Sequence, residues 1–230
     1  GVLQEFLLPL TNHAGVVQKR GIQSLYHFTQ ADNLENILKY GILTRKELNE
    51  QSIAYFQCDN DRAEGHLDSV SLSISHPNYK MFYLQRNKHP DKTWAVLDIN
   101  PEDILCNNDI RCAFYWTNAA DSRMKCLNPF DLEGAKSFET LFGNWPLNIS
   151  RKDSEPIERK KTLYDRFPTN PQAEILVFHS IEPSSIRQIF FQNEEDMERY
   201  QNIITQKPCP KCEVVFRQRY DSADWRTYCG

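Results

Sequence analysis

A single carboxylate at the start of an apolar strand is the first candidate for chemistry in this sequence. Residues 171–178 read PQAEILVF, and Glu174 stands directly before the run of aliphatic residues. Charged residues are depleted in strands and cost free energy to bury. A long polar segment, residues 143–171, lies just upstream, and a carboxylate fixed on a strand beside a long loop suits catalysis. Taken alone, the segment also fits a solvated glutamate at a strand end.

A second candidate group lies near the N-terminus, where residues 24–29 (SLYHFT) favour a short strand. His27 and Thr29 stand near the end of that strand. Residues 32–35 follow with the D-x-x-E spacing of a helix N-terminal capping box, and Gly41 is well placed to close that helix. The sequence therefore predicts a strand–helix unit that presents His27 and Thr29 at a strand end.

The composition indicates an ordinary globular chain with no bulk attraction for nucleic acid. Its 230 residues include 27 Lys and Arg against 31 Asp and Glu, which gives a formal net charge of −4, and 40% are hydrophobic. A nucleic-acid partner would need a local basic groove. The length allows one substantial core, so we predict a single domain over residues 1–230. No apolar run is long enough to span a membrane, and no membrane partner is expected.

The cysteines indicate a reducing compartment. The sequence has seven, an odd number, and most stand singly, which suits free thiols in the cytoplasm. Cys209 and Cys212 form one C-P-K-C pair, but the second pair that would complete a zinc site is missing from the sequence. We therefore expect no metal.

The remaining pattern predicts strands and helices without strict β-α alternation, which is typical of the α+β class. Further strands are expected at residues 69–74, 94–99, 112–116, 173–178, 186–191 and 214–216. Further helices are expected at residues 80–84, 101–105, 138–142 and 194–204, with Asn78 at a turn or helix start. The sequence has neither G-x-G-x-x-G nor G-x-x-x-x-G-K-[ST], so neither a Rossmann site nor a P-loop is indicated.

Four blocks of this sequence together resemble the DarT family, the DNA ADP-ribosyltransferase toxins of DarTG toxin–antitoxin systems. The first two are residues 25–29 (LYHFT) and 33–43 (NLENILKYGIL), a pattern shared by many NAD-using transferases of one fold. The other two, residues 71–83 (SLSISHPNYKMFY) and 171–177 (PQAEILV), are much narrower signatures. The blocks occur in family order, and the tail with the C-P-K-C pair lies outside them.

The resemblance implies a fold, a reaction and partners. The fold would be an ADP-ribosyltransferase-like split, twisted β-sheet pair with flanking helices, with NAD+ in the cleft between the sheets. NAD+ would be the co-substrate, and ADP-ribose would pass to a base of single-stranded DNA, either thymidine or guanine. The antitoxin would pair a macrodomain that hydrolyses the modification with a domain that blocks the toxin.

The resemblance also implies roles for individual residues. Glu174 would hydrogen-bond a ribose hydroxyl and stabilise the positive charge that develops on the sugar as nicotinamide leaves. Arg62 would contact the NAD+ phosphates and the target base, since a guanidinium suits both. The cofactor-binding candidates are His27, Thr29, Ser71, Ser73 and Tyr83.

The segment 143–171 matches in place the substrate-recognition loop of the family. It holds six basic and four acidic residues with Trp145 and Tyr164 among them. Cations for phosphates and rings for stacked bases are what single-stranded nucleic acid needs. The substrate-binding candidates are Arg151, Lys152, Tyr164 and Arg166.

Two other functions stay open from the sequence. One is an NAD-dependent transferase that acts on RNA and shares His27 and the fold but does not rely on Glu174. The other is a non-catalytic nucleic-acid-binding module in which the C-P-K-C pair is half of a zinc knuckle.

Overall fold

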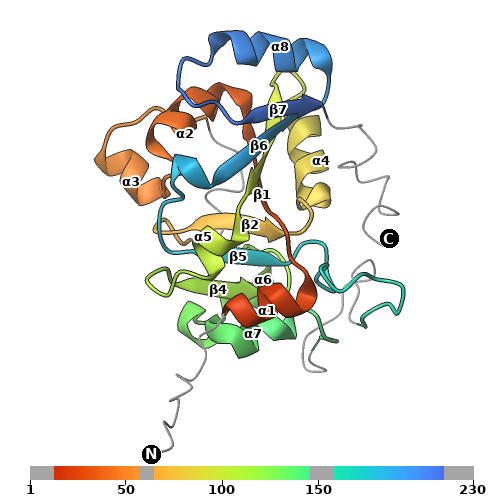
Figure 1. Cartoon of the computed structure of the whole chain (residues 1–230). Coiled ribbons are helices and arrows are strands. Elements are labelled where there is room, and N and C mark those ends of the chain that lie inside the picture. The colour runs from red at the N-terminus through yellow and green to blue at the C-terminus, as the bar shows by residue number, and fades with distance from the viewer. Residues whose placement is uncertain (1–12, 57–64, 146–157, 215–230) are drawn as a thin grey trace, which may run out of the picture.

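The computed structural model describes residues 13–56, 65–145 and 158–214 (Figure 1). Within them, seven strands form one sheet in the order β4-β5-β2-β1-β3-β6-β7. The strands are β1 (Leu25–Gln30), β2 (Val70–Ile74), β3 (Trp94–Ile99), β4 (Cys112–Tyr115), β5 (Glu174–Val177), β6 (Ile186–Phe191) and β7 (Lys211–Val214). The helices are α1 (His13–Arg20), α2 (Leu34–Tyr40), α3 (Arg45–Glu50), α4 (Tyr79–Lys88), α5 (Pro101–Leu105), α6 (Ser122–Lys125), α7 (Gly134–Thr140) and α8 (Glu194–Ile203). Short 3-10 turns are η1 (Ala31–Asn33), η3 (Pro129–Leu132) and η4 (Pro183–Ser185).

The sheet is nearly divided between β1 and β2. These two strands pair only at Leu25↔Ile74 and Tyr26↔Ser73, whereas β1 and β3 pair along the whole length of β1. Beyond Tyr26 the two strands separate, and Figure 1 shows β2, β5 and β4 running in a clearly different direction from β1, β3 and β6. The predicted α+β class and the split, twisted sheet pair with flanking helices are confirmed.

One apolar core holds the two groups of strands together. Leu25, Leu72, Leu97, Ile175 and Ile189, which come from five different strands, are all at most 1% exposed and belong to the same cluster. Burial of each such side chain stabilises the fold by about 1.5–3 kcal/mol. The strands that carry the candidate site are therefore held rigidly.

Two local signals that the sequence analysis used are confirmed. Gly41 ends α2 with φ at 92°, and a Cβ there would lie 2.3 Å from the carbonyl oxygen of Ile181, so only glycine fits. The side chain of Asn78 caps α4 by accepting a hydrogen bond from the backbone N–H of Met81 at 3.1 Å.

The predicted capping box at residues 32–35 is wrong. The helix begins after η1, its N-cap Asn33 makes no side-chain cap hydrogen bond, and both acidic side chains bind distant residues. Asp32 accepts a hydrogen bond from the Tyr200 hydroxyl at 2.7 Å, and Glu35 accepts one from the backbone N–H of Thr205 at 2.9 Å. The two carboxylates that the local pattern assigned to the cap therefore accept hydrogen bonds from α8 and the segment after it.

A true capping box occurs one helix later, where the sequence analysis named none. The Thr44 hydroxyl accepts from the backbone N–H of Glu47, and the Glu47 carboxylate accepts from the backbone N–H of Thr44. These reciprocal bonds fix the start of α3, which brings Arg45 to the candidate site described below.

Several elements differ from the expectations, and α4 extends to Lys88 rather than ending at residue 84. Helix α1 was not predicted, α7 begins at Gly134 rather than at residue 138, and the last strand is Lys211–Val214 rather than 214–216. Strand β7 pairs in parallel with β6, from Gln188↔Lys211 to Phe191↔Val214, so an existing strand edge sets its position. The prediction that residues 1–230 are a single domain stays a prediction.

Candidate functional site

Glu174 is the first residue of β5 and lies in the middle of the smaller group of strands. It pairs with Ser73 of β2 on one side and with Tyr115 of β4 on the other. Its side chain is not solvated, because the residue is only 7% exposed. Burial of a carboxylate costs free energy unless hydrogen bonds compensate it, so the partners of Glu174 decide what it can do.

Two donors hold the Glu174 carboxylate, one on each oxygen. The Ser71 hydroxyl donates to Oε1, and the backbone N–H of Ala119 donates to Oε2 at 2.6 Å. Hydrogen bonds to an ionised acceptor are about twice as strong as neutral ones. The two bonds therefore compensate the buried charge and fix the plane of the carboxylate.

Ser71 also links Glu174 to the larger group of strands. Its backbone carbonyl oxygen lies 2.9 Å from Nδ1 of His27, on β1. A carbonyl oxygen can only accept, so Nδ1 carries the proton of this bond. In a neutral imidazole this leaves Nε2 as the acceptor nitrogen, and the ring is held in a single orientation at the point where the sheet divides.

A pocket opens beside His27 and Ser71. Arg45 lies at the start of α3, and its guanidinium carbon is 5.2 Å from the centre of the Tyr55 ring, a cation–π distance. The pocket thus combines a cation, an aromatic ring and ring nitrogens, and Ser71 in its lining links it to the Glu174 carboxylate. The residues that line it include His27, Leu43, Arg45, Tyr55, His66 and Ser71.

The hydroxyls of Thr29 and Ser73 are used within the protein. Thr29 is fully buried and accepts a hydrogen bond from the side-chain amide of Asn33 at 3.0 Å. Ser73 accepts one from the backbone N–H of Asn78 at 3.2 Å. Tyr83 lies on α4 and is 44% exposed. Of the predicted site residues, the structure brings Ser71 into hydrogen-bond contact with both Glu174 and His27.

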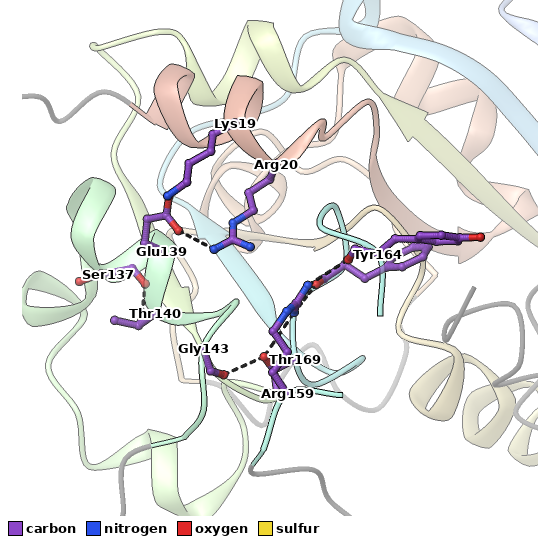
Figure 2. Close-up of polar contacts among 10 residues, drawn as sticks. Lys19, Arg20, Ser137, Glu139, Thr140, Gly143, Arg159, Tyr164 and Thr169 are labelled. Atoms are coloured by element: carbon purple, nitrogen blue, oxygen red, sulfur yellow. Dashed lines mark hydrogen bonds and ion pairs between the residues drawn. The ribbon is translucent and has the colours of Figure 1, made fainter. Parts of the chain in front are cut away.

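Hydrogen bonds hold the described end of the upstream loop, residues 158–173, in place. Arg159 donates to the carbonyl oxygens of Tyr164 at 2.9 Å (Figure 2) and Phe167 at 2.8 Å. Thr169 donates to the carbonyl oxygen of Gly143 at 2.7 Å, which closes the base of the loop. The loop therefore reaches β5 along one defined path.

Tyr164 and Arg166 form an exposed cation–aromatic pair on this loop. The guanidinium carbon of Arg166 lies 4.7 Å from the ring centre of Tyr164, and Tyr164 is 49% exposed. The backbone oxygen of Arg166 accepts from the Ser75 hydroxyl at 2.6 Å, which ties the pair to the segment after β2. The predicted site residues Arg62, Arg151 and Lys152 lie outside the described residues.

The structure adds groups that the sequence analysis did not name. The sequence could not identify the backbone N–H of Ala119 as a donor to Glu174, because every residue except proline has such a group. Arg45, Tyr55 and His66 reach the pocket only through the tertiary fold.

Neither a metal cluster nor a membrane helix occurs in the part of the chain that the structure describes. Residues 13–56, 65–145 and 158–214 contain no group of three or more His, Cys, Asp or Glu side chains that could hold a metal ion. None of the described helices has both the length and the apolar composition needed to cross a membrane.

Comparison with known proteins gives a family and three similar structures. A family model described as ssDNA thymidine ADP-ribosyltransferase, DarT, matches residues 26–222. Comparison with curated proteins gave no match. Thermosipho africanus DarTG in complex with ADP-ribose is 18% identical over 86% of this chain, with a TM-score of 0.54, and the chain spans 50% of that protein's length.

The other two similar structures are of one protein. Thermus sp. 2.9 DarT in complex with NAD+ is 16% identical over 84% of this chain and 95% of its own, with a TM-score of 0.51. The same DarT in complex with ADP-ribosylated ssDNA is 16% identical over 87% of this chain and 97% of its own, with a TM-score of 0.53. At this identity the likeness shows the fold.

A sheet that divides beside a buried, doubly hydrogen-bonded glutamate, with a pocket next to it, is the arrangement of an ADP-ribosyltransferase. The family match covers most of the sequence. The chain belongs to the DarT family of ssDNA thymidine ADP-ribosyltransferases.

Proposed function

We propose that this protein transfers ADP-ribose from NAD+ to thymine in single-stranded DNA, with Glu174 as the catalytic carboxylate. The observation that supports this most strongly is the Glu174 side chain, which is 7% exposed and held by donors on both oxygens. A buried charge fixed in this way is a preorganised partner for positive charge that develops in a transition state. The choice of thymine rests on the family description.

The pocket beside Glu174 suits the other parts of NAD+. Arg45 supplies a cation for the pyrophosphate, and the Tyr55 ring supplies a face for a base. His27 presents its accepting nitrogen for a ribose hydroxyl, because Nδ1 is committed to the Ser71 carbonyl. A Thermus relative of this fold is known in complex with NAD+.

The reaction breaks one bond and forms one. The bond between the ribose C1′ and the nicotinamide nitrogen breaks, and its electron pair leaves with neutral nicotinamide. The sugar passes through an oxocarbenium-like state, which a neighbouring carboxylate stabilises. Thymine in DNA has one ring N–H, and this nitrogen bonds to C1′ as its proton leaves. Glu174 is placed to stabilise the cation and to accept that proton.

The DNA strand would reach the site along the loop that precedes β5. Tyr164 is half exposed and offers a ring for stacking, while Arg166 beside it offers a charge for a phosphate. An unpaired base avoids the cost of being flipped out of a duplex, which is why a single strand is the favoured substrate. A relative of this fold is known in complex with ADP-ribosylated ssDNA.

The same proposal places the protein in a toxin–antitoxin pair in the cytoplasm. One similar structure is a DarTG protein in complex with ADP-ribose, which fits a partner that handles ADP-ribose, such as a macrodomain antitoxin. The described cysteines, including Cys106, Cys126 and Cys209, are free thiols, which fits a reducing compartment.

The test uses NAD+ labelled in its adenosine part. The protein is incubated with oligo(dT), oligo(dG) and a uridine RNA of equal length, and label on each is counted. We expect label on oligo(dT) alone, and we expect Glu174→Gln to lower the rate at least about 100-fold, as loss of one preorganised charge partner does. Glutamine can still accept from Ala119 and donate to the Ser71 hydroxyl, so the fold is retained.

Glu139→Gln is the matched control. Its carboxylate is likewise held by two partners, Lys19 at 3.2 Å and Arg20 at 3.1 Å, but it lies on α7 rather than on β5 (Figure 2). This variant is expected to keep the wild-type rate. Transfer to RNA would indicate an RNA-directed transferase, and bound zinc with no NAD+ turnover would indicate a non-catalytic module. Transfer to oligo(dT) that survives in Glu174→Gln would contradict the role of Glu174.

A further inference from the structure

A tight turn after β4 faces the catalytic carboxylate. Ala119 is 2% exposed and follows the strand that pairs with β5. Its backbone N–H points at Oε2 of Glu174 with a separation of 2.6 Å, short even for a hydrogen bond to a charged acceptor. Because this donor is part of the backbone, its direction depends on the conformation of the turn.

Asn118 sets that conformation. Its side-chain Oδ1 accepts from the backbone N–H of Ala120 at 2.8 Å, and its backbone oxygen accepts from the N–H of Asp121 at 2.9 Å. The first bond is an Asx turn and the second is a β-turn over the same four residues. The two bonds enclose the Ala119 peptide and leave its N–H free to point at Glu174. Asn118 is itself only 7% exposed.

The far end of the turn is fastened by a buried ion pair. Asp121 caps α6 by accepting from the backbone N–H of Arg123, and their side chains pair with a separation of 2.9 Å. The side chains are 7% and 9% exposed, and the Arg123 guanidinium carbon lies 5.0 Å from the ring centre of Trp145. The turn therefore has fixed points on both sides of Ala119.

We propose that Asn118 is a positioning residue for ADP-ribose transfer, because its Asx turn holds the Ala119 N–H on Glu174 and so fixes the carboxylate plane. This inference rests on the proposed catalytic role of Glu174. The Ser71 hydroxyl fixes Oε1 and the Ala119 N–H fixes Oε2, so the direction of the carboxylate toward the ribose depends on the conformation of the turn.

The first test is Asn118→Ala, which removes the side-chain acceptor and frees the Ala119 peptide to rotate. We expect kcat for oligo(dT) to fall about 10- to 100-fold, as small misplacements of reacting groups do, with KM for NAD+ within about threefold of wild type. Asn118→Ser keeps a shorter acceptor and is expected to recover part of kcat. A purely structural role would change thermal stability without this split between kcat and KM.

Asn128→Ala is the matched control. Asn128 makes the same kind of bond, from the backbone N–H of Phe130 to Oδ1 at 3.1 Å, at the start of η3. It should lose a similar amount of stability as Asn118→Ala while it keeps wild-type kcat. Equal kcat values in Asn118→Ala and wild type would overturn the proposal, as would equal losses of kcat in the two asparagine variants.

A second variant keeps the proposal testable if Asn118→Ala folds poorly. Ala119→Pro deletes the N–H itself, and an Asn-Pro sequence is compatible with turn initiation. It should lower kcat at least as far as Asn118→Ala. Wild-type transfer and its loss in Glu174→Gln are measured in the same assay. If the wild type transfers no ADP-ribose, or if Glu174→Gln keeps the wild-type rate, the proposed function is wrong. If both of these results are as expected and the turn variants are fully active, only the positioning role of Asn118 is wrong.

Discussion

Arg159 offers the sharpest test of how the loop before β5 is held. Its guanidinium donates to the carbonyl oxygens of Tyr164 (Figure 2) and Phe167, and its backbone N–H donates to the side chain of Asn144 at 2.8 Å. The guanidinium also donates to the Thr169 hydroxyl at 3.4 Å, so this one side chain joins three points of the loop. Arg159→Met keeps the length of the side chain and removes the guanidinium hydrogen bonds, including the two short ones to carbonyl oxygens that are counted below.

The expected effect is a local opening of the loop. Hydrogen bonds to a charged group contribute about 1.5–3 kcal/mol each, but water replaces part of this where the loop is exposed, so we take about 1 kcal/mol for each bond. The sum of about 2 kcal/mol corresponds to an opening equilibrium about 30-fold larger. Arg159→Lys should lie between wild type and Arg159→Met, because one ammonium cannot match the planar fork of a guanidinium.

Hydrogen exchange followed by mass spectrometry measures this opening. The backbone N–H groups of Leu163 and Phe167 are bonded within the loop, to Lys160 at 3.2 Å and Tyr164 at 3.1 Å. Their exchange should accelerate by that factor in Arg159→Met, while amides of β3 stay unchanged. Lys161→Met is the control, since it removes a neighbouring exposed charge. Wild-type exchange in Arg159→Met, or equal acceleration in Lys161→Met, would refute the reasoning.

Two further predictions concern the site and the core. Ser71→Ala removes the donor to Oε1 of Glu174, so kcat at saturating NAD+ should fall by about tenfold or more. Ser71→Thr should retain most of the wild-type kcat because it keeps the hydroxyl. Equal kcat in the two variants would contradict the role of the Ser71 hydroxyl. Burial lowers the pKa of His13, which packs edge-on to Phe114 with ring centres 5.0 Å apart. In the unfolded chain the His13 pKa is about 6.5, so above this pH the ring is neutral in both states and burial costs nothing. As the pH falls below 6.5, the unfolded chain binds the proton more readily than the fold does. The free energy of unfolding therefore decreases by up to about 1.4 kcal/mol per pH unit. Denaturant unfolding at pH 7.5 and 5.5 measures the free energy of unfolding. The decrease between the two pH values should be smaller in His13→Phe than in the wild type. An equal decrease in both proteins would contradict the role of His13.

Several features of the fold were readable from the sequence because they depend on local geometry. Alternating or continuous apolar residues predicted β3 and β6 with their observed bounds. Gly41 ended its helix because the chain needs a positive φ there and has no room for a Cβ. Asn78 capped α4 because its side chain reaches the nearby Met81 N–H. Such signals need only a few neighbouring residues.

The tertiary structure alone decided which partners the polar side chains take. Asp32 and Glu35 have capping-box spacing, yet residues about 170 positions away in the sequence bind them, because the packing of α8 brings those donors within reach. The same holds at the site, where the donors on Glu174 come from Ser71 and Ala119, 103 and 55 residues away. The sequence by itself determined that a carboxylate stands at the start of an apolar strand. Only the packed sheet decided that this carboxylate is buried, oriented and linked through Ser71 to His27, because hydrogen-bond partners across a fold are chosen by the geometry of packing.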